Sequence, residues 1–448
     1  MTYLAESFQE QTRASSKYPF RMLTRLKSIA IDLTPLRTSR DFRIIMASGL
    51  ITFLGSMVTY VALPFQVKEI TGSYVAVGLL GAIEIVPLVI FGLYGGTLAD
   101  SIDRKKMIVM MEVASLALTT ILLINSLLPH PKLWVLYVVA GIFAAVDGLA
   151  RPSLDAMIPR ILPHDQMMAA SALRSVRWQF GALLGPALGG ILIAWKGVSA
   201  GFIFDVVTYA FSILLLLRLT PSPAEHNSPA PTLSSLLEGV RYAFSRKDLL
   251  GTYAVDLAAM FFAMPNALFP FFADELHAPW ALGLLYSSAM FGSILATFTS
   301  GWTKKIHRHG RAILVAAIFW GAGISLAGAT SFLPLVFFGL ILAGGADQLS
   351  GIFRSTVWNQ TIPVELRGRL AGIELLSYSL GPLGGQTRAG VMAQFSGLRT
   401  SIVGGGILCI GAVAALGAAL PTFRKYDDRT NEFALAERKK RAGTSERE

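Results

Sequence analysis

The chain has 448 residues, of which 53% are hydrophobic and only 15% are charged. Soluble globular domains carry about 25% charged residues, so this composition excludes an ordinary soluble protein and predicts an integral membrane protein. The net charge of +11 is spread over many short connections between apolar runs, which favours membrane topology over nucleic-acid binding. The single cysteine, Cys409, excludes an intrachain disulfide and a cysteine-based metal site.

The first 42 residues are polar and basic, and they precede a full-length apolar run, so we expect no cleaved signal peptide. Within this cytoplasmic N-terminal segment (1–42), residues 18–33 place apolar side chains at helical spacing with basic side chains between them. This pattern predicts an amphipathic helix on the inner leaflet of the membrane, and a disordered tail is the alternative.

Twelve apolar runs follow, each of the roughly 20 residues needed to cross a bilayer core of about 30 Å. They cover residues 43–64, 75–99, 107–128, 133–154, 167–193, 199–218, 249–273, 280–301, 311–330, 333–355, 368–392 and 399–420. The Pro/Ser-rich stretch at 220–231 cannot span a membrane. We therefore expect four further parts: a six-helix bundle (43–219), a cytoplasmic linker with an interfacial helix (220–248), a second six-helix bundle (249–421), and a cytoplasmic tail (422–448) that is solvated from Arg424 onward.

The two bundles repeat one plan about 200 residues apart. In both, an aspartate (Asp147, Asp347) precedes an apolar run that contains Gly-Pro and a Gly-Gly pair (residues 185–190 and 381–385). A protein built from two similar halves can rock about the seam between them and expose a midplane cavity alternately to each side. The repeat predicts an all-α integral membrane transporter with 12 transmembrane helices in two pseudo-symmetric bundles.

Lysine and arginine concentrate in the even-numbered connections, as at residues 104–106 and 304–311, whereas the odd-numbered connections carry single cations or none. Short basic loops stay in the cytoplasm. We therefore expect a multi-pass protein of the inner (cell) membrane with both termini cytoplasmic.

The connection between the second and third spans reads GGTLADSIDRKK over residues 95–106. It resembles the G-x-L-A-D-R-x-G-R-K signature of the major facilitator superfamily, with departures at Ser101 and Asp103. Its Asp-Arg-Lys-Lys ending, together with likeness along most of the chain, is similar to the branch that contains enterobactin-type and macrolide-type exporters.

This resemblance implies a gating loop whose functional residues are Gly96, Asp100, Arg104 and Lys105. Asp100 is expected to accept hydrogen bonds from the start of the eleventh span, because the N-terminus of a helix favours an anion. Arg104 and Lys105 are then expected to hold the inner face closed through charge pairs. A basic loop that only obeys membrane topology is the alternative.

The fifth span carries glycines four residues apart and a proline, a pattern that gives a smooth strip for close helix contact. It resembles the antiporter motif G-x-x-x-G-P-x-x-G-G of superfamily exporters and favours export over import. A packing strip of the kind also found in importers is the alternative. The matching residues are Gly181, Gly185, Pro186, Gly189 and Gly190.

Ionisable residues inside apolar spans are costly and are functional candidates by default. Burial disfavours the charged form of a carboxyl group, so such a group can take up and release a proton as a cavity closes and opens. The candidates for proton coupling are Glu84, Asp147, Asp347 and Glu374. Fixed ion pairs, such as Asp347 with Arg354 or Asp147 with Arg151, are the alternative. Asp205 and Asp256 lie nearer to span ends, which favours capping or interfacial roles.

Trp178 and Tyr378 fall in spans expected to face the cavity, where aromatic rings can hold a large apolar substrate; contact with lipid is the alternative. No phosphate-binding G-x-x-x-x-G-K-[ST], H-E-x-x-H or G-x-S-x-G motif is present, so we expect neither an ATP-driven pump nor an enzyme, and no metal or cofactor.

The resulting prediction is a monomeric secondary transporter for proton-coupled efflux of a bulky amphipathic small molecule such as a siderophore, a macrolide or another drug. A proton symporter that imports a nutrient and a non-transporting membrane sensor of the same fold are the alternatives.

Overall fold

The computed structural model describes the backbone of residues 32–101, 103–221, 241–242 and 245–445, and the side chains of these residues except 93–101, 151–156, 364–376 and 441–445. Residues 18–31 of the expected amphipathic helix and residues 222–240 of the expected linker lie outside this part. All the long elements that follow are α-helices, as an apolar chain that must satisfy its backbone hydrogen bonds inside a membrane requires.

The first bundle begins after a short helix whose C-terminal residue leads into Ser39. The Ser39 side chain caps the first long helix by accepting a hydrogen bond from the Phe42 backbone nitrogen at 3.2 Å. Asp103 caps the third long helix in the same way, by accepting a hydrogen bond from the Lys106 backbone nitrogen at 3.0 Å. The helices are α3 (Thr34–Thr38), α4 (Arg40–Thr71), α5 (Tyr74–Ser101), α6 (Arg104–Ser126), α7 (Leu133–Ile161), α8 (Met167–Lys196) and α9 (Val198–Leu216).

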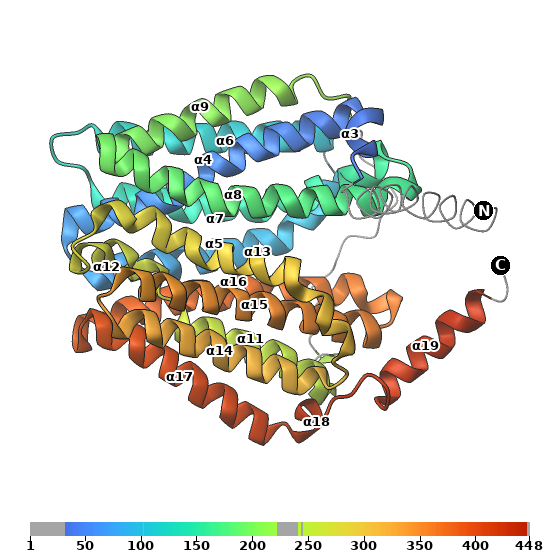
Figure 1. Ribbon diagram of the computed structural model, residues 1–448. Coiled ribbons are helices and arrows are strands. Elements are labelled where there is room, and N and C mark those ends of the chain that lie inside the picture. The colour runs from blue at the N-terminus through green and yellow to red at the C-terminus, as the bar shows by residue number, and fades with distance from the viewer. Residues whose placement is uncertain (1–31, 102, 222–240, 243–244, 446–448) are drawn as a thin grey trace, which may run out of the picture.

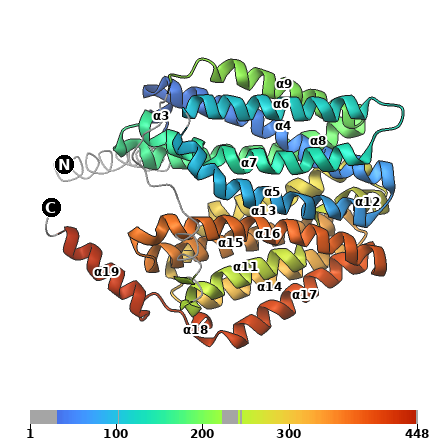
Figure 2. The ribbon, with the colours of Figure 1, turned by 180° about the vertical axis from the view of Figure 1, so that it is seen from behind.

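The second bundle lies beside the first, and Figure 1 shows the two stacked with their long helices running in the same general direction. The view from behind in Figure 2 shows the same stacking, with α5 and α13 near the seam. The helices are α11 (Lys247–Ala263), α12 (Phe269–Glu275), α13 (Leu282–Thr299), α14 (His309–Ala329), α15 (Leu333–Thr361), α16 (Val364–Ser396), α17 (Leu398–Ala419), α18 (Pro421–Arg424) and α19 (Glu432–Ser445).

Eleven helical segments of the described residues are long and apolar enough to cross a membrane. α16 takes the place of the predicted eleventh span and packs against α5, α11 and α17. The all-helical architecture in two bundles therefore agrees with the expectation from the apolar repeat.

The seventh predicted span is not one continuous helix. α11 ends at Ala263, Met264 is extended (φ −101°, ψ 100°), and α12 begins only at Phe269. Pro265 explains the break, because a proline ring disfavours the helical conformation of the residue before it and the proline has no N–H to donate.

The two bundles share one packing plan. α4 contacts α8 and α9 as α11 contacts α16 and α17, and α5 contacts α7 as α13 contacts α15. The turns repeat too: Gly197 (φ 77°) joins α8 to α9, and Gly397 (φ 90°) joins α16 to α17. Glycine suits both turns because other residues are strained at such positive φ angles. These pairs relate α4–α9 to α11–α17 in order.

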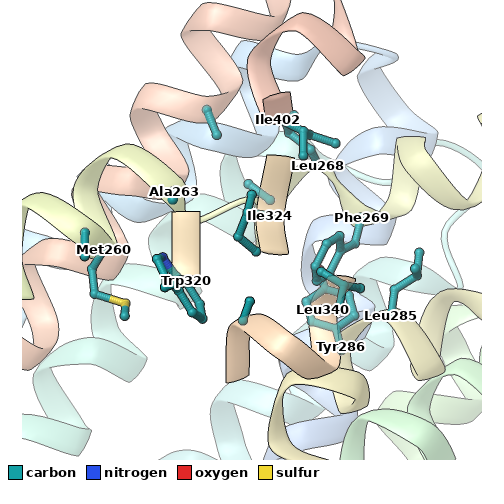
Figure 3. Packing of buried hydrophobic residues seen from close by; sticks show 14 of the residues in the cluster. Met260, Ala263, Leu268, Phe269, Leu285, Tyr286, Trp320, Ile324, Leu340 and Ile402 are labelled. Atoms are coloured by element: carbon teal, nitrogen blue, oxygen red, sulfur yellow. The ribbon is translucent and has the colours of Figure 1, made fainter. Parts of the chain in front are cut away.

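The largest buried apolar cluster is centred in the second bundle, where helices from several directions converge. Figure 3 shows part of it, with the Trp320 and Ile324 side chains of α14 facing the space between the helices. Trp320 is 6% exposed and Ile324 is 2% exposed. Between helices in lipid, close packing of this kind replaces the solvent-driven association found in soluble proteins.

The C-terminal segment is packed and not fully solvated, which corrects the expectation for residues from Arg424 onward. Tyr426 is 2% exposed, and the carboxyl group of Asp428 lies 3.0 Å from Nδ1 of His307. The guanidinium carbon of Arg246 lies 3.3 Å from the centre of the Phe433 ring. α19 also packs on α15, and its first turns carry apolar and aromatic side chains among the charges.

Candidate functional site

A cavity of about 630 Å³ lies among the helices of the first bundle. Three of the predicted residues line it: Glu84 of α5, Asp147 of α7 and Trp178 of α8. Glu84 and Asp147 are close enough for their charges to interact. The structure thus brings two of the proton-coupling candidates to one cavity wall, although they come from different helices.

Basic, aromatic and polar groups line the same cavity. Arg174 and Arg177 of α8 face it, and Gln386 of α16 reaches it from the second bundle. Trp178 is 52% exposed, as a ring on a cavity wall can be. A space with acidic, basic and aromatic groups on its wall can bind a large amphipathic molecule, because rings contact its apolar part and charged groups contact its polar part.

Asp347, the third candidate, lies in an ionic cluster of the second bundle. One nitrogen of the Arg354 guanidinium is 3.5 Å from the Asp347 carboxylate, and the other forms an ion pair with Asp256 of α11. Ser377 of α16 donates a hydrogen bond to Asp256 at 3.0 Å. The structure therefore contains the Asp347–Arg354 ion pair, which is the alternative to a proton-coupling role for Asp347.

Asp256 is 4% exposed and sits in the interior of this cluster, which corrects the expectation of a capping or interfacial role. Tyr378 of α16 lies beside it: the Arg354 guanidinium is 5.7 Å from the centre of its ring, and the Trp358 ring is 6.1 Å away. The predicted aromatic Tyr378 therefore contacts the ionic cluster while keeping 48% of its surface exposed.

The expected capping or interfacial role of Asp205 is wrong as well, because Asp205 is fully buried inside α9 and caps no helix end. It accepts hydrogen bonds from hydroxyl groups of α4, α6 and its own helix. Glu112 of α6 accepts a hydrogen bond from Thr52 of α4 at 3.2 Å. A sequence signal for this group existed: hydroxyl residues recur at helical spacing in the first, third and sixth spans.

The predicted antiporter-type motif in α8 has two faces. A side-chain carbon at Gly181, Gly185 or Gly189 would meet residues of α4. At Gly190 it would lie 2.4 Å from the backbone nitrogen of Gly283 in α13. Pro186 lies on this second face, since its carbonyl oxygen would be 2.5 Å from a side-chain carbon at Gly283. The motif thus packs α8 both within its own bundle and against the other bundle.

A second close contact between the bundles mirrors the first. Gly78 and Gly81 of α5 pack against the backbone of α16, and Thr387 donates a hydrogen bond to the Gly78 carbonyl oxygen at 3.0 Å. On the α8–α13 side, Ser287 donates to the Leu183 carbonyl oxygen at 2.7 Å. Gly78 and Gly81 lie in the first turns of α5 and Ser287 near the start of α13, and both helices begin at the end of the molecule that holds α12, away from α3 and α18 (Figure 1).

The α12 end also carries polar and aromatic contacts between the bundles. Lys68, near the end of α4, forms an ion pair with Asp274 of α12. Asn266 donates a hydrogen bond to the Tyr60 hydroxyl at 3.0 Å, and the Tyr60 and Tyr286 rings meet edge to face at 5.6 Å. Together these contacts hold the bundles close at this end.

The predicted gating loop is only partly described. Arg104 is buried, with 7% of its surface exposed, at the start of α6. The Lys105 ammonium group donates hydrogen bonds to the carbonyl oxygens of Leu217 and Leu219, at 2.9 and 2.6 Å, just after α9. Gly96 and Asp100 lie outside the described side chains, as does the coupling candidate Glu374 in α16. Within the described residues, no group of three His, Cys, Asp or Glu side chains is placed to hold a metal ion.

Comparison with known proteins gives a consistent result. A family model described as transmembrane secretion effector matches residues 30–441. The enterobactin exporter EntS of Citrobacter koseri is 27% identical over 406 residues, which cover 87% of this chain and 94% of that protein. The Escherichia coli exporter of the same name has the same identity and coverage.

Solved structures share the fold at low sequence identity. The nucleoside transporter NupG superposes with a TM-score of 0.69 at 13% identity, covering 87% of this chain and all of that one. A bacterial homologue of the human lysosomal transporter Spinster, in an inward-facing and occupied conformation, gives a TM-score of 0.69 at 16% identity, covering 86% and 98% of the two chains.

Proposed function

The chain belongs to the major facilitator family of transmembrane secretion effectors, and from that membership we propose that it exports a bulky amphipathic small molecule in exchange for protons. It is a membrane transporter of the inner membrane and not an enzyme. The observation that carries the proposal is the cavity of about 630 Å³ with the carboxyl groups of Glu84 and Asp147 on its wall.

The export direction is supported by two features. The two relatives named above, which match over 87% of the chain, are both named enterobactin exporter. The α8 motif of Gly181, Gly185, Pro186, Gly189 and Gly190 matches the antiporter pattern, and it lies at a contact between the bundles. A siderophore, a macrolide or another drug of similar size is the proposed class of substrate.

Alternating access follows from where the bundles touch. The described contacts between them gather at the α12 end. If the basic connections and both termini are cytoplasmic, this end faces outward, and the structure corresponds to a state open toward the cytoplasm. A substrate would then enter the cavity from the cytoplasm and leave after the bundles rock and the α12 end separates.

Proton movement would supply the driving force. The proposed carriers are Glu84 and Asp147 at the cavity and Asp347 in the second bundle, with Glu374 outside the described side chains. A carboxyl group that alternates between a wet and a dry environment changes its proton affinity, because burial disfavours its charged form. Taking up a proton from outside and releasing it inside would couple the two fluxes.

The proposal can be tested in an efflux-deficient bacterial host and then in inverted membrane vesicles. We expect cells that make the protein to accumulate less of its substrate from a panel of siderophores and macrolides, and we expect a protonophore to abolish the difference. Glu84→Gln and Asp147→Asn should reduce gradient-driven flux at least about tenfold, while Asp165→Asn, an exposed acid in the short 3-10 helix His164–Gln166, should not.

Two other results would contradict export. Uptake into intact cells that increases with the proton gradient would identify an importer. A panel with no substrate flux under any gradient would identify a sensor of the same fold. Either result would overturn the proposed export.

A further inference from the structure

Three helices of the first bundle present hydroxyl-bearing side chains to one another. On each helix the serine and threonine residues of this set recur three or four positions apart, so they lie on one face, and Tyr209 adjoins Thr208. The polar face (the hydroxyl ladder) is formed by Thr52, Ser56 and Thr59 of α4, Ser115 and Thr119 of α6, and Thr208, Tyr209 and Ser212 of α9. It contains two carboxyl groups, Glu112 and Asp205, and both line the cavity.

Asp205 is surrounded by hydroxyl groups from three sides. One carboxylate oxygen accepts hydrogen bonds from Thr59 of α4 and from Thr119 of α6, the latter at 3.3 Å. The other accepts from Thr208, one turn along α9, at 3.3 Å. The residue is 0% exposed. A carboxyl group in this position is held at a fixed point where three helices meet.

Glu112 has fewer hydroxyl partners than Asp205 among the described residues. Thr52 donates to its two carboxylate oxygens at 3.2 and 3.3 Å. Ser212 of α9 lies next to the same carboxyl group and is 0% exposed, yet its hydroxyl oxygen has no hydrogen-bond partner among the described residues. A buried hydroxyl with unused capacity beside a carboxyl group can accept a hydrogen bond from the neutral acid or donate one to the anion.

The charges around the ladder do not neutralise these two acids. In the described part of the chain, neither Glu112 nor Asp205 forms an ion pair. The phenol of Tyr209 hydrogen-bonds to Ser56 at 2.9 Å. From the neighbouring helices, Arg174 and Arg177 of α8, Glu84 of α5 and Asp147 of α7 line the shared cavity.

In the second bundle, two acids within the helices have a cationic partner. There, Arg354 forms ion pairs with Asp256 and Asp347 and supplies the compensating positive charge. Among the described residues, the two carboxyl groups of the ladder have hydroxyl partners and no cationic partner, and two unpaired anions at this depth would be very costly. Hydroxyl groups suit both protonation states of an acid, whereas a guanidinium group stabilises only the anion.

We propose that Glu112 and Asp205 form a proton-binding site within the hydroxyl ladder, reached through the cavity. A proton adds to a carboxylate oxygen as the site closes and leaves to water as the cavity opens, with no other bond made or broken. This inference rests on the proposed proton coupling, and it adds Glu112 and Asp205, two further residues of the cavity wall, to the carriers proposed above.

The test follows the proton itself and needs no transported substrate. The infrared C=O absorption of protonated carboxyl groups is recorded for the full-length protein in lipid as the pH is raised. We expect Glu112→Gln and Asp205→Asn each to remove part of the pH-dependent loss of this band, and the double variant to remove the sum of the two parts. Asp256→Asn is the matched control, because it removes a buried carboxyl group that has a cationic partner, Arg354, and lies outside the hydroxyl ladder.

Two checks keep the result interpretable. Thermal unfolding confirms that each variant is folded, and Glu112→Asp, which keeps an acid beside Ser212, should retain the band if Glu112→Gln fails to fold. Replacing sodium chloride by choline chloride should leave the titration unchanged.

An unchanged band in both single variants would overturn the inference, and so would a titration that depends on sodium, because the site would then bind an alkali cation. A proton signal that these variants remove, in a protein whose transport ignores the proton gradient, would uphold the site and refute the proposed coupling.

Discussion

Buried carboxyl groups in this protein have two kinds of partner. Asp256 meets Arg354 in the second bundle, whereas Asp205 meets threonine hydroxyl groups in the first. An ion pair favours the charged form of its members, whereas hydroxyl partners can hydrogen-bond to either protonation state of an acid. The two bundles therefore place the same residue type in different chemical roles, although their helices correspond.

Arg354 is 3% exposed and is expected to be structurally essential. Arg354→Gln would leave Asp256 and Asp347 without their cation, and removing one partner of a buried ion pair costs about 3–5 kcal/mol. We expect a clear fall in the thermal unfolding temperature in detergent, with partial recovery in the Arg354→Gln/Asp256→Asn double variant. Arg311→Gln, on the exposed side of α14, should change little. A stable Arg354→Gln protein would refute the role assigned to this cluster.

Lys105 offers a second test at this scale, because its ammonium group holds the carbonyl oxygens after α9. Lys105→Met should lower the free energy of unfolding by about 1–2 kcal/mol, since two charge-assisted hydrogen bonds at a helix C-terminus are lost. Its exposed neighbour Lys106 provides the control Lys106→Met. Unchanged stability with lost transport would instead favour the gating role that the loop motif implies.

At the scale of helices, glycine determines where the bundles can approach. α8 uses Gly181, Gly185 and Gly189 against α4 and turns Gly190 toward α13, while α16 meets Gly78 and Gly81 of α5. Small residues let helix backbones come close enough for dispersion contacts and weak hydrogen bonds to hold them in lipid. The same strips therefore both build each bundle and join the two.

A methyl group at this contact should disturb one conformational state and not the fold. Gly190→Ala would place a carbon 2.4 Å from the Gly283 backbone nitrogen, and such overpacking costs about 1–3 kcal/mol. Separation at the α12 end relieves it, so a cysteine placed at Ser287, 5% exposed, should react faster with a membrane-impermeant maleimide.

Gly411→Ala is the matched control, because a side-chain carbon there meets nothing within 4 Å. The native Cys409 is buried and should add little background. Equal labelling rates in the Gly190→Ala and Gly411→Ala proteins would mean that the α8–α13 contact does not hold the α12 end closed.

At the scale of the whole molecule, the bundles are joined at the α12 end by backbone contacts, rings and the Lys68–Asp274 ion pair. Lys68 and Asp274 come from different bundles, and the Asp274 side chain is 47% exposed. Exposed ion pairs contribute little to stability, but a pair that exists in only one state shifts the balance between states by its full value.

Asp274→Lys should therefore shift the population away from the state closed at this end, by about 1 kcal/mol or roughly fivefold in the ratio. The Lys68→Asp/Asp274→Lys double variant should restore it. Spin labels at His130 and Ser331, which lie in exposed loops of the two bundles, would report the separation by pulsed electron resonance. Identical distance distributions in the single and double variants would contradict the prediction.

The amino-acid sequence alone determined the apolar spans, the repeat of one six-helix plan and the family signature, because the bilayer imposes length and hydropathy on each span separately. It also offered the pairing of Asp347 with Arg354 as the alternative to a coupling role, since both lie on one face of one helix. Periodicity within a single helix is local information, and these features need no other.

Only the tertiary structure decided which side chains meet across helices. Asp256 reaches Arg354 of α15, Asp205 reaches Thr59 of α4, and Lys105 reaches the end of α9, each through packing of segments far apart in the chain. The position of an acid along its own span predicts its depth, but its partner depends on helix rotation and crossing, which are set by the glycine contacts between helices.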